Sequence, residues 1–195
     1  MLNVLIALAM RTISQPREAA VEILSMRPER SILWSALALA VVLNTIVYQL
    51  SLVLTPPQGP LPVMFTSPII FAGFIGAGLI LSIYSLTYAG HFIGGKASLE
   101  SIMASLIWLQ FLRFAVQLVA FVLMIIMPGI AGLLVLGATL YGMYLLLHFI
   151  DVAHEFDNLF TSFGALILSG LGIMLGLAIL LSMLGVQNMG LTPYV

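Results

Sequence analysis

Charged residues are confined almost entirely to three short stretches of this sequence, residues 1–30, 96–100 and 151–157. Long apolar runs and uncharged loops separate these stretches, and Arg113 is the one charged residue outside them. A chain with this pattern that crosses a bilayer an odd number of times places nearly all of its charge on one aqueous side. The pattern therefore predicts a membrane protein with one charged and one uncharged face.

Five apolar runs are long enough to cross a bilayer as helices. A spanning helix needs about 20 apolar residues, because hydrocarbon offers no hydrogen-bond partner to an open backbone. Only 7% of the residues are charged, whereas about a quarter are charged in soluble domains. We predict an all-α polytopic membrane protein, a five-transmembrane-helix bundle, with spans at about 31–54, 68–93, 102–126, 130–150 and 162–184.

Basic residues near the spans predict the orientation, because arginine and lysine accumulate on the cytoplasmic side. Four arginines precede the first span, and Lys96 lies between the second and the third. The loops 55–67 and 127–129 and the tail 185–195 contain neither residue type. We expect a bacterial inner (cytoplasmic) membrane protein with a cytoplasmic N-terminus and a periplasmic C-terminus.

Residues 1–30 are expected to form a separate cytoplasmic or interfacial segment ahead of the five-span domain of residues 31–195. Ala20 and Ile23 share one face of a predicted helix that opens with Pro16. We interpret it as an interfacial amphipathic helix, with the apolar residues before it as a second, shallow anchor. The alternative is a surface helix that packs on the cytoplasmic ends of the spans.

Arg113 lies in the middle of the third predicted span and shares a helical stripe with Gln110 and Gln117. An arginine at that depth costs at least about 2.5 kcal/mol on insertion scales, so we expect it to face the bundle or water. Asn44 and Tyr48 in the first span are candidates for the same intramembrane polar site. The site would contact lipid or a partner; the alternative is a structural arginine that holds the span in register.

The end of the fourth span carries a cytoplasmic polar cluster of two histidines and two acidic residues. Imidazole with carboxylate can hold zinc or iron. However, the sequence contains no second ligand-rich helix and no HExxH pattern. We therefore expect no metal and no cofactor, and interpret the cluster as a solvated helix end with local ion pairs, formed by His148, Asp151, His154 and Glu155.

Glycines indicate where helices approach one another closely. Small residues four apart let helix backbones come together in a membrane. We predict packing positions at Gly73, Gly76, Gly172 and Gly176. The segment from Gly90 to Ala97 is close to a phosphate-binding loop, but an apolar span precedes it and Ala97 replaces the required Ser or Thr. We interpret Lys96 as the anchor of a turn, with Ser98 capping the third span.

Three segments of this chain form a recognisable combination. The first is Ile13-Ser-Gln-Pro-Arg-Glu-Ala-Ala-Val-Glu-Ile-Leu, followed by Pro28 and five spans of these lengths. The second is the short turn 94–100, with Ser-Leu-Glu leading into the third span. The third is the stretch 144–160, in which a span runs into a polar turn. Together they resemble the bacterial branch of the Yip (Ypt/Rab-interacting-protein-like) family.

The resemblance implies a helical membrane protein with a cytoplasmic N-terminus and no catalytic residues to carry over. Eukaryotic relatives are linked to vesicle trafficking and Rab-type GTPases, a role we do not expect here because their long cytoplasmic N-terminal region has no counterpart in this sequence. We expect a non-enzymatic accessory subunit, assembly factor or scaffold. Its partners would be membrane lipids and other integral membrane proteins, not nucleic acid, with a homo-oligomer as an open alternative. The second hypothesis is a small transporter or channel around Arg113.

Overall fold

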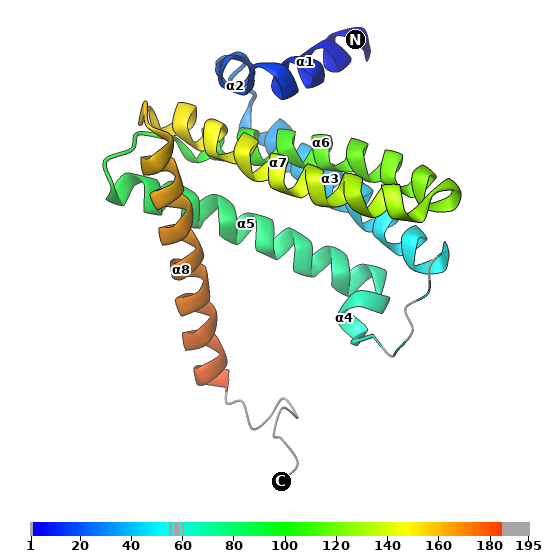
Figure 1. Cartoon of the computed structure of the whole chain (residues 1–195). Helices are drawn as coiled ribbons and strands as arrows, with labels where there is room; N and C mark the ends of the chain where they lie inside the picture. Colours follow the sequence, from blue (N-terminus) through cyan, green and yellow to red (C-terminus); the bar gives the residue numbers. More distant parts are fainter. Residues whose placement is uncertain (1, 55, 57–58, 60, 185–195) are drawn as a thin grey trace.

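The computed structural model is built from helices joined by short connections (Figure 1). It describes residues 2–54, 56, 59 and 61–184, and no strand occurs among them. This confirms the all-α prediction. The helices, in chain order, are α1 (Leu2–Ser14), α2 (Pro16–Ser25), α3 (Arg30–Leu54), α4 (Val63–Thr66), α5 (Pro68–Phe92), α6 (Leu99–Ile126), α7 (Pro128–His154) and α8 (Leu159–Leu184).

Five of these helices, α3, α5, α6, α7 and α8, are long and apolar enough to cross a membrane. Their ends lie within four residues of the predicted spans. The multi-pass helical prediction is thus confirmed at the level of helix length and composition. The predicted uncharged tail, residues 185–195, lies outside the described residues.

Capping and proline chemistry explain where α6 and α7 begin. The hydroxyl oxygen of Ser98 accepts a hydrogen bond from the backbone N–H of Ser101 at 3.1 Å, and Glu100 lies in the first turn, where a carboxylate is favourable. The predicted cap is therefore confirmed. Met127 alone separates α6 from α7, and Pro128 occupies the first position of α7, where its missing N–H costs nothing.

The starts of α3, α6 and α8 meet the ends of α5 and α7 at one end of the bundle, which we call the charged end. A buried apolar core lies there, formed by residues of all five long helices, among them Leu33, Ile83, Ile102, Ile150 and Ala165. Two exposed ion pairs border it: Arg30 with Glu100 at 3.0 Å and Lys96 with Glu155 at 3.2 Å. The charged stretches of the sequence that flank the long helices thus come together at one end of the bundle.

Helix α8 contacts α5 and α7 near the charged end and then leaves the other long helices (Figure 1). The last polar contact is the hydroxyl of Ser85 in α5, which donates to the carbonyl oxygen of Ser169 at 2.9 Å. Beyond Ile173, every α8 residue whose side chain is described, up to Ile179, is exposed. The outer part of α8 therefore covers no other helix in this structure.

Of the two N-terminal helices, α2 contacts α7 and α6, and α1 contacts α2 (Figure 1). The predicted amphipathic helix is α2, which buries Ala20 and Ile23 against Phe149 of α7. Helix α1 buries only Leu8 and Thr12 among its described side chains. Helix α2 thus packs on α7 and α6, as the alternative of a surface helix packed on the spans expects, and α1 contacts α2.

Two hydrogen bonds fix the depth of α1. The indole N–H of Trp108 donates to the hydroxyl oxygen of Thr12 at 3.0 Å, and the hydroxyl of Tyr141 donates to the carbonyl oxygen of Ile13 at 2.5 Å. Trp108 is about 14 Å along α6 from the charged end, and Tyr141 about 20 Å along α7, at 1.5 Å per residue. The C-terminal end of α1, where Met10 is exposed and Arg11 pairs with Glu18 and Glu22, therefore lies beside α6 and α7 at the level of Trp108 and Tyr141.

This placement predicts that α1 is embedded in the bilayer. The chain has no cysteine, so an environment-sensitive fluorophore can be attached to Met10→Cys alone, or to Ser25→Cys at the end of α2 as the control. In vesicles, we expect lipid-borne nitroxide to quench the label at position 10 and aqueous iodide to quench the label at position 25. Equal quenching of both labels by iodide would contradict the embedded position.

Candidate functional site

Asp151 joins three segments at the charged end. Its carboxylate is 1% exposed and lies 3.3 Å from the guanidinium of Arg17 in α2. Its Oδ1 atom accepts a hydrogen bond from the backbone N–H of Asn158 at 2.8 Å and lies 3.5 Å from the hydroxyl of Ser162 in α8. Because a buried charge must be paired and hydrogen-bonded, this carboxylate positions α2 and the start of α8 on α7.

His154 occupies a cradle formed by two glycines. Its ring is buried and stacks on Phe156, with the ring centroids 5.0 Å apart. A Cβ atom on Gly90 would lie 2.0 Å from the ring, and one on Gly95 would lie 2.4 Å from it. The glycine spacing that suggested a phosphate loop is therefore explained by close packing on a histidine.

The backbone of Ala97 connects two histidines at this point. Nε2 of His91 donates to the carbonyl oxygen of Ala97 at 2.7 Å, and the N–H of Ala97 donates to Nδ1 of His154 at 3.4 Å. His154 is thus a neutral acceptor at Nδ1, which leaves its proton on Nε2. That nitrogen is buried and has no hydrogen-bond partner.

The four residues of the predicted polar cluster have separate partners. Asp151 and His154 are buried, whereas Glu155 is exposed and pairs with Lys96. Nδ1 of His148 lies 3.0 Å from the carbonyl oxygen of Tyr144 in its own helix. Among the described residues, no three histidine or acidic side chains come together as a metal site. Asp151, His154 and Glu155 contact segments outside α7, whereas the contact of His148 lies within α7.

Arg113 is exposed, and Gln110 and Gln117 are half-buried. Within the part of the chain that the structure describes, no hydrogen bond or ion pair engages the guanidinium of Arg113. The Oε1 atom of Gln117, one helical turn away, is buried and also has no partner. The stripe predicted on α6 thus contains a guanidinium that the protein leaves unpaired and that is able to bind an anionic group, and beside it an amide oxygen that is free to accept a hydrogen bond.

Asn44 and Tyr48 lie on α3, which packs against α6. The Nδ2 atom of Asn44 donates to the carbonyl oxygen of Ala40 at 2.7 Å, while its buried Oδ1 atom has no partner. The Arg30–Glu100 ion pair sets the starts of α3 and α6 level, so Asn44 and Arg113 lie at similar depth. The ring of Tyr48 stacks instead on the ring of Phe71 in α5, with the ring centroids 4.1 Å apart.

Two of the four predicted packing glycines lie at helix contacts. A Cβ atom on Gly76 would lie 3.8 Å from Val41 of α3, and one on Gly172 would lie 3.5 Å from the hydroxyl oxygen of Ser85 in α5. Gly73 has no neighbouring atom within 4 Å, and neither has Gly176. In this structure, therefore, small residues bring α5 close to α3 and α8 close to α5.

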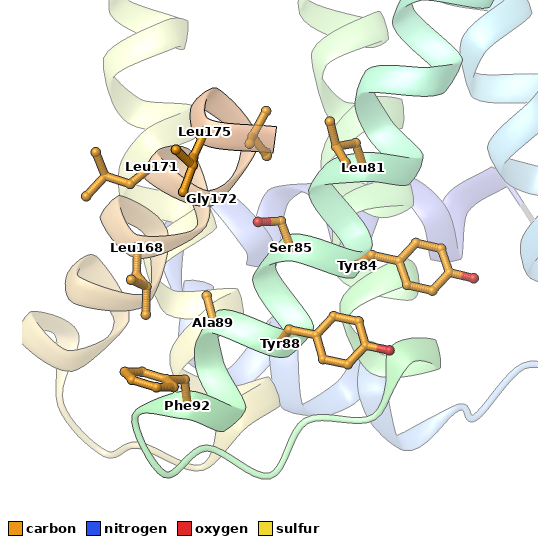
Figure 2. A pocket seen from close by; sticks show the side chains of 11 residues that line it. Leu81, Tyr84, Ser85, Tyr88, Ala89, Phe92, Leu168, Leu171, Gly172 and Leu175 are labelled. Atoms are coloured by element: carbon orange, nitrogen blue, oxygen red, sulfur yellow. The ribbon is translucent and has the colours of Figure 1, made fainter. Parts of the chain in front are cut away.

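An open groove of about 580 Å³ lies where α8 separates from α5 (Figure 2). Its walls are apolar, with Leu81 and Phe92 on α5 and Leu168 and Leu171 on α8. Figure 2 shows Ser85 pointing towards α8 and the rings of Tyr84 and Tyr88 pointing away from it. The groove offers a surface for acyl chains or apolar side chains and no cluster of polar groups.

The architecture is that of a polytopic helical membrane protein, with five apolar helices and their charge gathered at one end. The family comparison agrees with this class: the model of the Yip1 domain matches residues 10–183. The chain belongs to the Yip1 domain family, which confirms the predicted family. Comparisons with curated proteins and with solved structures found no match.

Sequence reasoning missed the roles of three groups of residues. The burial of Asp151 has no sequence signal, because Glu155, an acidic residue one turn further along, is exposed. The Thr12–Trp108 hydrogen bond joins residues 96 positions apart. Two glycines that flank the end of a helix are a sequence signal for close packing, and they could have indicated the cradle around His154. Their spacing does not predict that a histidine fills it.

The Asp151 interactions predict a large difference between two isosteric substitutions. Asp151→Asn removes a buried charge that pairs with Arg17 and should lower the free energy of unfolding by about 2 kcal/mol. Glu155→Gln removes an exposed partner of Lys96 and should cost less than about 1 kcal/mol. Thermal unfolding in mild detergent measures both values. Equal losses would show that Asp151 does not join the segments as described.

The glycine cradle predicts that Gly90→Ala destabilises the protein by about 2 kcal/mol through overpacking against the ring of His154. Gly78→Ala in the same helix meets nothing within 4 Å and should be neutral or stabilising by up to about 1 kcal/mol. The double change Gly90→Ala with His154→Ala should recover part of the loss. Thermal unfolding in mild detergent measures these changes as well. A Gly90→Ala variant with unchanged stability would refute the close packing of Gly90 on His154.

Proposed function

We propose that this protein acts inside the bilayer by associating with other integral membrane proteins, as an accessory subunit, assembly factor or scaffold, and that it is not an enzyme. The observation that carries this proposal is the unpaired guanidinium of Arg113 at mid-span. A charge in hydrocarbon is costly, so such residues pair with one another, with backbone carbonyls or with water. A chain that leaves its only mid-span charge unpaired is suited to completing that pairing with another molecule.

The proposed setting is a bacterial inner membrane with the charged end in the cytoplasm. Five of the six basic residues lie at that end or in α1 and α2 beside it, and basic residues mark the cytoplasmic side. Under this orientation the N-terminus is cytoplasmic and the C-terminus periplasmic. The apolar groove between α5 and α8 supports lipid contact as part of the same role.

A small transporter or channel is the second candidate. The observation that favours it is the pair of buried amide oxygens without partners, on Asn44 and Gln117, near the depth of Arg113. Water or a small solute would satisfy such atoms. If the protein is a transporter, Arg113 is necessary for the flux of a solute. If it is an accessory subunit or scaffold, Arg113 is necessary for the complex with another membrane protein.

Extraction in several gentle detergents tests the proposal. We expect an integral membrane protein to co-purify with the tagged chain in a fixed ratio, and that ratio to be preserved in lipid nanodiscs. The chain purified without partners in every gentle detergent would contradict an accessory or scaffold role.

Arg113→Leu separates the two candidates. Under the association proposal, the variant loses the co-purifying protein and no solute flux in proteoliposomes depends on position 113. A variant of normal abundance that keeps its partners but loses a measurable flux would favour the transporter. Leu118→Ala, on an exposed position of the same helix, is the matched control and should change neither readout.

A further inference from the structure

Arg113 points to the packed side of α6. Leu106 lies seven residues before it and Ala120 seven residues after it, and both are buried. Seven residues are almost two full turns, so all three side chains leave the helix on the same side. The side chain between two buried neighbours is nevertheless exposed. The packed side of α6 is therefore uncovered at its middle.

The chain holds no counter-charge for this arginine. Its seven acidic residues lie at positions 18, 22, 29, 100, 151, 155 and 157, all at the charged end or in α2. Glu100, the acidic residue of α6 itself, is thirteen residues from Arg113, or about 20 Å along the helix. A second copy of this chain would bring another arginine to the same depth and no carboxylate.

Lipid head groups are also out of reach. Arg113 is as far from Ile126 at one end of α6 as from Glu100 at the other, which places it near the middle of a hydrocarbon core about 30 Å thick. Long basic side chains reach head groups only from positions near helix ends. The bilayer itself therefore supplies no anion for this guanidinium.

We propose that the uncovered middle of α6 receives a transmembrane helix of another protein, and that this helix carries an aspartate or glutamate at mid-bilayer depth that pairs with Arg113. This inference rests on the proposed function and specifies the partner by one feature, an acidic residue in the middle of a transmembrane helix. A carboxylate matches the planar guanidinium with two parallel hydrogen bonds.

Synthetic peptides test this without knowledge of the natural partner. Two leucine-rich transmembrane peptides are compared in vesicles of zwitterionic lipid, one with a single central glutamate and one with glutamine there. A central residue lies at mid-bilayer whichever way the peptide inserts. Energy transfer to a label at Ile126→Cys, in a chain without native cysteine, reports association of the full-length protein.

We expect the glutamate peptide to bind about tenfold more tightly than the glutamine peptide. Arg113→Gln should bring the ratio to about one, and Arg113→Lys, which keeps the charge but loses the planar two-bond match, should give an intermediate ratio. Arg27→Gln, which changes an exposed arginine outside the spans, is the matched control and should leave the tenfold ratio intact.

No preference for the glutamate peptide, or a preference that survives in Arg113→Gln, would overturn the inference. Loss of the preference when anionic lipid is added would assign the site to head groups and overturn it as well. A natural partner that still co-purifies with Arg113→Gln would refute the carboxylate pairing and leave the proposed function standing. Glutamate binding by a chain that co-purifies with no protein would refute the proposed function instead.

Discussion

The cost of placing a charge in hydrocarbon is the constraint on which this structure depends. It confines twelve of the thirteen charged side chains to one end of the bundle or to the helices beside it. It also makes the remaining charge informative, because Arg113 is retained at mid-span against that cost. The protein satisfies the constraint everywhere except at the position where we infer that another molecule completes it.

The charged end holds the long helices together through a few buried polar groups. Asp151 bonds to α2 and to the start of α8, and the ring of His154 fills the space that Gly90 and Gly95 leave. Towards the uncharged end, α8 diverges from α5 and α7, whereas α6 and α7 remain side by side (Figure 1). The long helices are therefore held together at the charged end, while Arg113 in the middle of α6 stays exposed and accessible to a further helix.

The sequence predicted the fold class, the five spans and the cap at Ser98, because hydrophobic length and capping are local properties. It also predicted, from the cost of exposing a charge to lipid, that Arg113 would face the bundle or water, and in the structure the Arg113 side chain is exposed without a hydrogen-bond partner. It did not predict the cradle around His154 or the position of α1. Both depend on contacts between residues far apart in the chain, such as Thr12 with Trp108. Local sequence patterns do not predict such contacts.

An experimental structure of the protein in lipid nanodiscs, isolated together with whatever co-purifies, would show what pairs with Arg113. We predict that a carboxylate of a second protein lies within about 4 Å of the guanidinium of Arg113, the usual limit for an ion pair. A guanidinium bonded to the oxygens of Asn44 and Gln117 of its own chain, with α8 folded back over it, would refute the proposed pairing.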